Sequence, residues 1–321
     1  MSWLRSRLLL CCLTATLSAH QELPPAPGKL FDAGNGRRLH LLCAGQGSPT
    51  VILEAGASSF AIDWTLVQTA LQKTHRVCAY DRAGSGWSDP LPADTLATDA
   101  RDLRALLASA NERAPYVLAG ASRGGLLIRA YLADYPADVA GLVFVDPSTE
   151  DRLFGMVAGK AMLIAEMTAE QMRSTLPSRP VRIPRRPPQK GAPFDRLSPE
   201  LYQQRVLLDE RLIASIPESL TPEQLGRYQE GERAFLARLL ATRSGGTAFG
   251  DRPTVVLSRG DERNEGREGV HAALARLSSN SRHSVIAGAG HEIHLFQPEA
   301  VIVAITDVLA AIATKSRLPV R

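Results

Sequence analysis

Ser122 stands between glycines at the point where an apolar run ends. The run "YVLAG" (116–120) precedes it and a helical pattern over 123–135 follows it. A sharp turn from strand to helix needs small neighbours and presents the central hydroxyl above the strand end. This placement predicts a nucleophile for acyl transfer; the alternative is a glycine-rich turn with an incidental serine. The residues of this Gly-x-Ser-x-Gly pattern are Gly120, Ala121, Ser122, Arg123 and Gly124.

His291 has the best position for the base that such a serine requires. A serine hydroxyl is a weak nucleophile at neutral pH and needs a base within hydrogen-bonding distance, which is in turn oriented by an acid. His291 lies in "AGAGHEIHLFQPEA", after an apolar run and a glycine pair, and ahead of a helix that Pro298 helps to start. His294 is the alternative base, although its position favours packing against the following helix.

The elements that would position these residues alternate along the chain. Nearly continuous apolar runs of this kind are typical of strands buried on both faces of a parallel sheet. Helical patterns between them predict an α/β protein with a mostly parallel sheet and helices on both faces. The runs cover residues 37–45, 50–56, 76–81, 116–120, 141–146, 254–260 and 283–288. The main helical patterns cover residues 95–110, 123–135 and 299–313.

The alternation stops at Asp146 and resumes near Thr254. The segment between them reads as three helices, over residues 151–176, 198–215 and 222–242. A stretch rich in proline and arginine (178–196) must be a loop, because proline stops helices and removes backbone donors. We therefore expect a helical lid over 147–250, inserted into a core formed by 20–146 and 251–321.

The first 19 residues have the features of a secretory signal peptide. Arg5 and Arg7 precede the apolar stretch 8–17, and Ser18 and Ala19 are small, as a cleavage site requires. This predicts an exported protein, secreted or periplasmic. The rest of the chain has no stretch long enough to span a membrane. The formal charge of +4 is small and not clustered, so no nucleic-acid partner is expected.

The motifs together resemble the α/β-hydrolase superfamily over almost all of the chain after the leader. "VILEAG" (51–56) resembles the strand before that family's oxyanion loop, and "YDRAGSGWSD" (80–89) resembles the loop after its fourth strand. "GAGHEIHLFQPEAVIVAI" (288–305) resembles its histidine loop and last helix. The resemblance implies an α/β-hydrolase fold and a serine hydrolase with a lid after the sixth strand. Many members have His-Gly where this chain has Ala55-Gly56.

The resemblance also implies the remaining site residues. Asp146 fills the family's acid position after the sixth strand, whereas Asp261 lies after the seventh strand but nearer to it than is usual. We favour Asp146 and keep Asp261 as the alternative. The backbone N–H groups of Ala57 and Arg123 occupy the positions of the oxyanion donors. Asp81 is expected to hold the loop 80–89 through backbone N–H groups.

A serine triad of this kind serves acyl transfer to water without a cofactor, and no metal-binding cluster is evident. Methionines 156, 162, 167 and 172 fall within the first expected lid helix, where Met156 and Met167 would share a face. They favour either an apolar substrate pocket or simple packing. We expect a carboxylic ester hydrolase acting on a small molecule with an apolar part. Other activities on this scaffold, such as peptidase, amidase or haloperoxidase, and a non-catalytic binding role are the alternatives; the oligomeric state stays open.

Cys11 and Cys12 would leave with the leader, so Cys43 and Cys78 remain. In the implied fold these two lie on neighbouring strands, close enough for a disulfide. Both also lie in apolar runs, where free cysteine packs well. The sequence leaves both states open.

Overall fold

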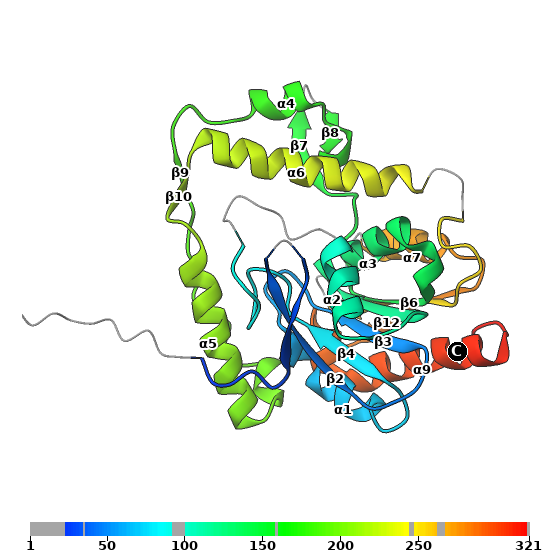
Figure 1. The fold of residues 1–321 in the computed structure, drawn as a ribbon. Coiled ribbons are helices and arrows are strands. Elements are labelled where there is room, and N and C mark those ends of the chain that lie inside the picture. Colours follow the sequence, from blue (N-terminus) through cyan, green and yellow to red (C-terminus); the bar gives the residue numbers. More distant parts are fainter. Residues whose placement is uncertain are drawn as a thin grey trace, which may run out of the picture.

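The computed structural model describes residues 23–34, 36–91, 100–157, 160–243, 247–261 and 267–319. Eight strands form one sheet in the order β1-β2-β4-β3-β5-β6-β11-β12 (Figure 1). From β4 to β12 neighbouring strands are parallel, while β2 runs antiparallel to both β1 and β4. The strands are β1 Lys29–Asp32, β2 Arg38–Ala44, β3 Thr50–Glu54, β4 Val77–Tyr80, β5 Tyr116–Ala121, β6 Val139–Val145, β11 Thr254–Gly260 and β12 Ser281–Ala287.

The seven strands expected from apolar runs are all present. The short edge strand β1 is additional, and its sequence KLFD is largely exposed, so it carries no apolar run. Strand β3 shows why the central runs are continuous: Val51 and Leu53 pack into one apolar core, while Ile52 packs into the other. Successive side chains of a strand point to opposite faces, so burial on both faces requires an unbroken apolar run.

Helices cover both faces of the sheet (Figure 1). On one face of the sheet, the apolar core contains Trp64 and Val67 from the segment around the first helix, together with Val301 and Ile305 of the last helix. Leu106 and Tyr131 belong to the other core. The first face is covered by α1 (Thr65–Leu71) and α9 (Pro298–Thr314), and the second by α2 (Ala100–Ser109), α3 (Arg123–Asp134) and α7 (Arg267–Ala275). Residues 95–99 of the helix expected over 95–110 lie outside the described residues.

The insertion between β6 and β11 differs in part from the expectation. Helices α5 (Pro199–Ser215) and α6 (Pro222–Ala241) match two of the three expected helices. The prediction of a helix over 151–176 is wrong, because this segment contains an antiparallel hairpin and only a short helix. Periodicity alone does not separate a short apolar strand from a helix, and Gly155 disfavours a helix interior. The new elements are β7 Leu153–Val157, β8 Lys160–Leu163, η3 Ile164–Glu166, α4 Ala169–Ser174, β9 Val181–Arg182, η4 Phe194–Arg196 and β10 Ser219–Leu220.

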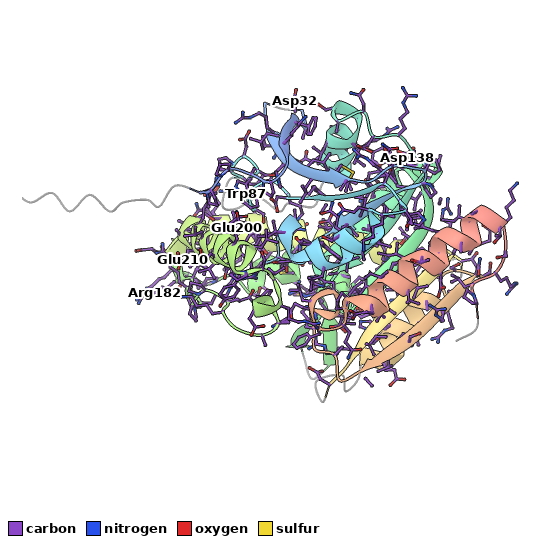
Figure 2. All side chains as sticks on the ribbon, turned by 90° about the horizontal axis from the view of Figure 1, so that it is seen from below. Asp32, Trp87, Asp138, Arg182, Glu200 and Glu210 are labelled. Carbon is purple, nitrogen blue, oxygen red and sulfur yellow. A yellow bond between two sulfur atoms is a disulfide. The ribbon has the colours of Figure 1, made fainter. Side chains whose placement is uncertain are left out.

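Two helices fasten the insertion to the core. Helix α6 lies above the sheet in Figure 1 and packs through Phe235 and Leu236 against Leu126 and Leu127 of α3. Helix α5 runs down one side, and its Leu208 joins an apolar cluster with Phe60 and Trp87. Glu200 and Glu210 of α5, labelled in Figure 2, are exposed. Trp64 and Trp87 are buried core residues.

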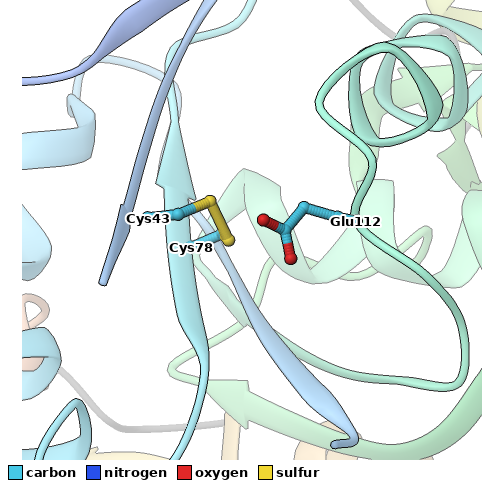
Figure 3. Close-up of side chains that lie close together, drawn as sticks. All are labelled: Cys43, Cys78 and Glu112. Atoms are coloured by element: carbon cyan, nitrogen blue, oxygen red, sulfur yellow. A yellow bond between two sulfur atoms is a disulfide. The ribbon is translucent and has the colours of Figure 1, made fainter. Parts of the chain in front are cut away.

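The cysteines on neighbouring strands are bonded. Cys43 of β2 lies directly opposite Cys78 of β4, and the S–S distance is 2.02 Å (Figure 3). Glu112 lies beside the pair, and its carboxylate accepts hydrogen bonds from Arg76. Sulfur atoms joined to each other are not thiolate ligands, so this group is a disulfide rather than a metal site. Among the described helices, none is long and apolar enough to cross a membrane.

Candidate active site

The carboxyl ends of the parallel strands bring the predicted site residues to one edge of the sheet. Ser122 directly follows β5, Asp146 directly follows β6, and His291 lies four residues after β12. Gly56 comes from the loop after β3. Ser122 and His291 are 169 positions apart in the sequence, and the parallel topology places both at this edge of the sheet. Among the described residues His291 is hydrogen-bonded to Asp146, and no hydrogen bond joins it to Ser122 Oγ.

Ser122 occupies the strained turn that its glycine neighbours predict. Its backbone has φ 50° and ψ −120°, a region that costs a non-glycine residue about 1–3 kcal/mol. A Cβ on Gly120 would lie 2.6 Å from the carbonyl carbon of Gly124, and a Cβ on Gly124 would lie 2.4 Å from the carbonyl oxygen of Glu54. Both positions therefore exclude any larger residue. The Ser122 N–H donates to Val145 O at 3.0 Å, which fixes the turn against β6.

Asp146 and His291 form a direct pair. His291 Nδ1 lies 2.5 Å from Asp146 Oδ2, and the Asp146 side chain is fully buried. An ionised carboxylate can only accept, so Nδ1 carries the proton and Nε2 is the unprotonated nitrogen. Burial alone would raise the pKa of Asp146, but the hydrogen bond and charge of His291, together with Arg259, outweigh burial and hold that pKa below its usual value. The unprotonated Nε2 is therefore available to accept a proton. Asp261 lies farther out, in the lining of a pocket beside His291.

Arg259 is a site residue that sequence reasoning missed. Its Nε donates to Asp146 Oδ2 at 2.9 Å and its backbone N–H donates to Oδ1 at 3.2 Å. Its Nη2 lies 3.3 Å from His291 Nδ1. The guanidinium compensates the buried carboxylate. The sequence indicated only that Arg259 lies near the end of an expected strand. It did not indicate that the partner of Arg259 is Asp146, more than 100 residues away.

His294 does not have the surroundings of a base. It is 2% exposed and stacks on Trp64, with ring centroids 4.5 Å apart. Burial, and to a lesser extent the charges of His291 and Arg205, lower the pKa of His294 to about 3. Neither ring nitrogen has a hydrogen-bond partner within the described chain. Within the described residues no carboxylate is hydrogen-bonded to this ring, which packs on Trp64.

A second histidine pair supports the backbone next to Asp146. His271 Nε2 lies 2.9 Å from the carbonyl oxygen of Pro147, which can only accept, so this nitrogen donates. His271 Nδ1 and His283 Nε2 both contact Ser258 Oγ, at 2.7 and 2.8 Å. The chain of contacts fixes the segment that follows the acid. Each of these residues lacks a local motif, which is why the sequence did not single them out.

Two backbone N–H groups remain available beside Ser122. A Cβ on Gly56 would lie 3.4 Å from Ser122 Cβ, so the loop after β3 runs directly against the serine. The N–H groups of Ala57 and Arg123 donate to no acceptor in the described part of the chain. Arg123 also begins α3, where the helix dipole favours negative charge. These are the two groups predicted to be oxyanion donors.

The pocket beside His291 lies between the insertion and the core. Its volume is about 930 Å³. Phe194 and Pro193 line it from the insertion, and Phe296 lines it from the segment after His291. Lys190, Arg259, Asp261 and Glu292 add charge of both signs around these apolar side chains. The arrangement can hold a small molecule that is partly apolar.

The α/β-hydrolase fold family matches residues 49–298 of the chain, well over half of its length. The chain belongs to the α/β-hydrolase fold family. This membership establishes the expected fold.

Individual relatives of this α/β hydrolase match less completely in sequence. It is 34% identical over 121 residues to the cis-3-alkyl-4-alkyloxetan-2-one decarboxylase of Shewanella oneidensis, covering 36% of this chain and 37% of that protein. The chain thus spans less than two-fifths of that relative. Its structure resembles a thermophilic esterase from Thermogutta terrifontis, with a TM-score of 0.59, 22% identity and coverage of 88% and 98%. It also resembles the enol-lactonase of Burkholderia xenovorans, with a TM-score of 0.55, 17% identity and coverage of 87% and 99%. These two likenesses concern the fold.

Proposed function

We propose that the protein is a serine hydrolase that cleaves carboxylic esters through an acyl-enzyme on Ser122. His291 is the base, Asp146 orients it, and the N–H groups of Ala57 and Arg123 stabilise the oxyanion. The observation that carries the proposal is the hydrogen bond from His291 Nδ1 to buried Asp146 at the sheet edge where the strained turn holds Ser122. The pair leaves Nε2 free to accept a proton.

The reaction follows from these positions. His291 Nε2 takes the proton of Ser122 Oγ as the oxygen attacks the ester carbonyl carbon. The carbonyl oxygen becomes an oxyanion and accepts hydrogen bonds from the two N–H groups, each worth about 3 kcal/mol in comparable sites. Collapse of this intermediate expels the alcohol, which receives the proton from His291. Water then attacks the acyl-enzyme with His291 again as the base, releasing the carboxylic acid and restoring Ser122.

An apolar portion of the substrate fits the pocket beside His291. Phe194, Pro193 and Phe296 supply its apolar surface. Met156 and Met167 do not share a helix face, because the expected helix over 151–176 is absent. Met167 and Met172 are buried and pack within the insertion. A panel of matched esters, lactones and amides would rank these substrate classes.

A fluorophosphonate probe tests the nucleophile. We expect one label per folded molecule, on Ser122, and at least a hundredfold slower labelling in His291→Ala. Ser122→Ala should take no label, whereas Ser148→Ala, a serine two residues past Asp146, should react as the wild type does. Labelling that survives Ser122→Ala, or a folded wild type that takes no label, would contradict the proposal.

We further propose that the insertion acts as a lid and that residues 1–19 are a signal peptide. The leader lies outside the described residues, so its support is the basic start, the apolar stretch and the small residues at 18 and 19. Mass spectrometry of protein from the exterior or envelope of the native cell should find a chain starting near His20. An intact chain that starts at Met1 or Ser2 would count against export.

A further inference from the structure

We propose that Arg82 is a positioning residue that aims the Ala57 N–H at the substrate oxyanion. The proposal rests on the proposed function. In it, Arg82 fixes the orientation of the peptide bond between Gly56 and Ala57. Arg82 follows β4, and its guanidinium reaches across to the loop after β3. Its Nη1 donates to the carbonyl oxygen of Ala55 at 2.7 Å, and its Nη2 donates to that of Gly56 at 2.5 Å.

The guanidinium is itself held in place. Its Nη1 also donates to Glu54 Oε1 at 2.6 Å, and the side chain of Glu54 is 1% exposed. The other oxygen of Glu54 accepts the hydroxyl of buried Tyr80. The planar fork of arginine offers several donors in a fixed geometry, so it can bind a carboxylate and two carbonyl oxygens together. Arg82 therefore imposes a direction on both carbonyl groups.

That direction determines where the next N–H points. A trans peptide is planar, and its C=O and N–H bonds point in opposite directions. The Gly56–Ala57 bond is not among the cis bonds of the chain. With the Gly56 carbonyl turned toward Arg82, the Ala57 N–H points away from it. Gly56 lies against Ser122, and the Ala57 N–H has no acceptor in the described residues, so it is free for a substrate oxygen.

The rest of the loop is held by the neighbouring residue. Asp81 Oδ1 accepts the N–H of Ala61 at 2.8 Å, which anchors the far end of the loop 55–61. Asp81 also accepts the N–H of Trp87 at 3.3 Å, as expected for the loop 80–89. Ala55 has only a methyl side chain and cannot hold the loop itself. Of Asp81 and Arg82, only Arg82 contacts the carbonyl oxygen of Gly56, which also accepts the N–H of Ser59 at the longer distance of 3.4 Å.

Arg82→Gln tests the proposal against a matched control, Arg76→Gln. Arg76 flanks the other end of β4 and also binds a carboxylate and a backbone carbonyl, those of Glu112 and Gly45. Loss of one oxyanion donor lowers kcat by about 10²–10³-fold. We expect this loss in Arg82→Gln with KM changed less than about threefold, a similar loss of affinity for an alkyl boronic acid, which forms a tetrahedral adduct on serine, and no such change in Arg76→Gln.

Arg82→Lys keeps the charge but not the fork, and it should retain part of the activity; it replaces Arg82→Gln if that variant does not fold. A folded Arg82 variant with wild-type kcat, or with reduced kcat and unchanged boronic acid affinity, would overturn the proposal. The fluorophosphonate label on wild-type Ser122 separates the two ideas. A labelled and active wild type supports the nucleophile whatever Arg82 does, whereas an unlabelled wild type overturns both.

Discussion

In the proposed mechanism Asp146 orients His291 through a hydrogen bond, which Asp261 would have to replace if it were the acid. The contact uses the Nδ1 nitrogen of His291, and the buried carboxylate also receives Arg259. Arg259 is cationic, and His291 becomes cationic in the proposed mechanism when it accepts a proton. In the proposed mechanism Asp146 therefore fixes the tautomer of His291 and stabilises the imidazolium that forms when Ser122 loses its proton.

Asp146→Asn should lower kcat by about 10⁴-fold with little change in KM, because an amide in this place favours the wrong tautomer of His291. The matched variant Asp261→Asn removes a carboxylate from the pocket lining and should lower kcat by less than about tenfold. Steady-state kinetics on one ester decides between them. The reverse order of effects would transfer the acid role to Asp261.

The site residues that could be predicted from the sequence are those that lie in local sequence motifs. Ser122 and His291 lie in glycine-flanked turns, and Asp146 ends an apolar run. Arg259, Arg82 and His271 have no such signature, since each acts on a residue from a different strand. Their partners become visible only when the order of the strands is known.

Helices α6 and α3 are joined by charge as well as by apolar packing. Arg129 of α3 forms an ion pair with Glu150, and it also donates to the Leu239 carbonyl of α6 at 3.2 Å. Arg243, just after α6, lies 3.2 Å from the same Glu150 carboxylate. Glu150 is fully buried and Arg129 is 2% exposed. The carboxylate thus links the insertion to the core between two cations.

Glu150→Gln should lower the free energy of unfolding by about 3–5 kcal/mol, because it leaves the buried guanidinium of Arg129 without its counter-charge. Asp134→Asn is the control. It breaks the pair between Asp134 of α3 and Arg238 of α6, which joins the same helices with side chains 31% and 46% exposed. Exposed pairs contribute about 0–1 kcal/mol. Urea unfolding measures both changes, and equal effects would contradict the assigned role of Glu150.

The same variant predicts a change in acid stability. Burial alone would raise the pKa of Glu150, but Arg129 and Arg243 outweigh it and hold that pKa below the usual 4.5. A lowered folded-state pKa gives stability that is present above the unfolded-state pKa and is lost as the pH falls through the folded-state pKa. The wild type should therefore lose stability below about pH 4.5, and Glu150→Gln should lose less over that interval.

The sheet was predictable at the scale of elements because burial on both faces leaves continuous apolar runs. The elements of the insertion were less predictable. Ser198 and Thr221 cap the N-termini of α5 and α6, and their side chains accept hydrogen bonds from backbone N–H groups. Each helix has proline at its first position. Such caps mark helix starts in a sequence. The segment 151–176 consists of short apolar pieces, for which strand and helix patterns are alike.

The disulfide constrains the whole molecule, because it joins β2 to β4 across 35 residues of sequence. Closing a loop of this length in the unfolded chain stabilises the fold by about 4 kcal/mol in the chain-entropy description. Reduction, or Cys43→Ala with Cys78→Ala, should therefore lower the midpoint of urea unfolding markedly. A thiol count on unfolded, unreduced protein that starts at His20 should find none. Two thiols would mean that these cysteines are free core residues.

The docking of α6 on α3 has a consequence for how the protein could acquire new substrates. Moving helix α6 away from α3 would expose the apolar side chains of Leu126 and Phe235. The pocket beside His291 is bounded on the insertion side by residues 189–194. This loop contributes no strand to the sheet and no residue to the proposed triad. Loops tolerate replacement better than the elements they connect. Evolution, or a mutant library, could thus exchange this rim to admit different esters while the catalytic machinery stays unaltered.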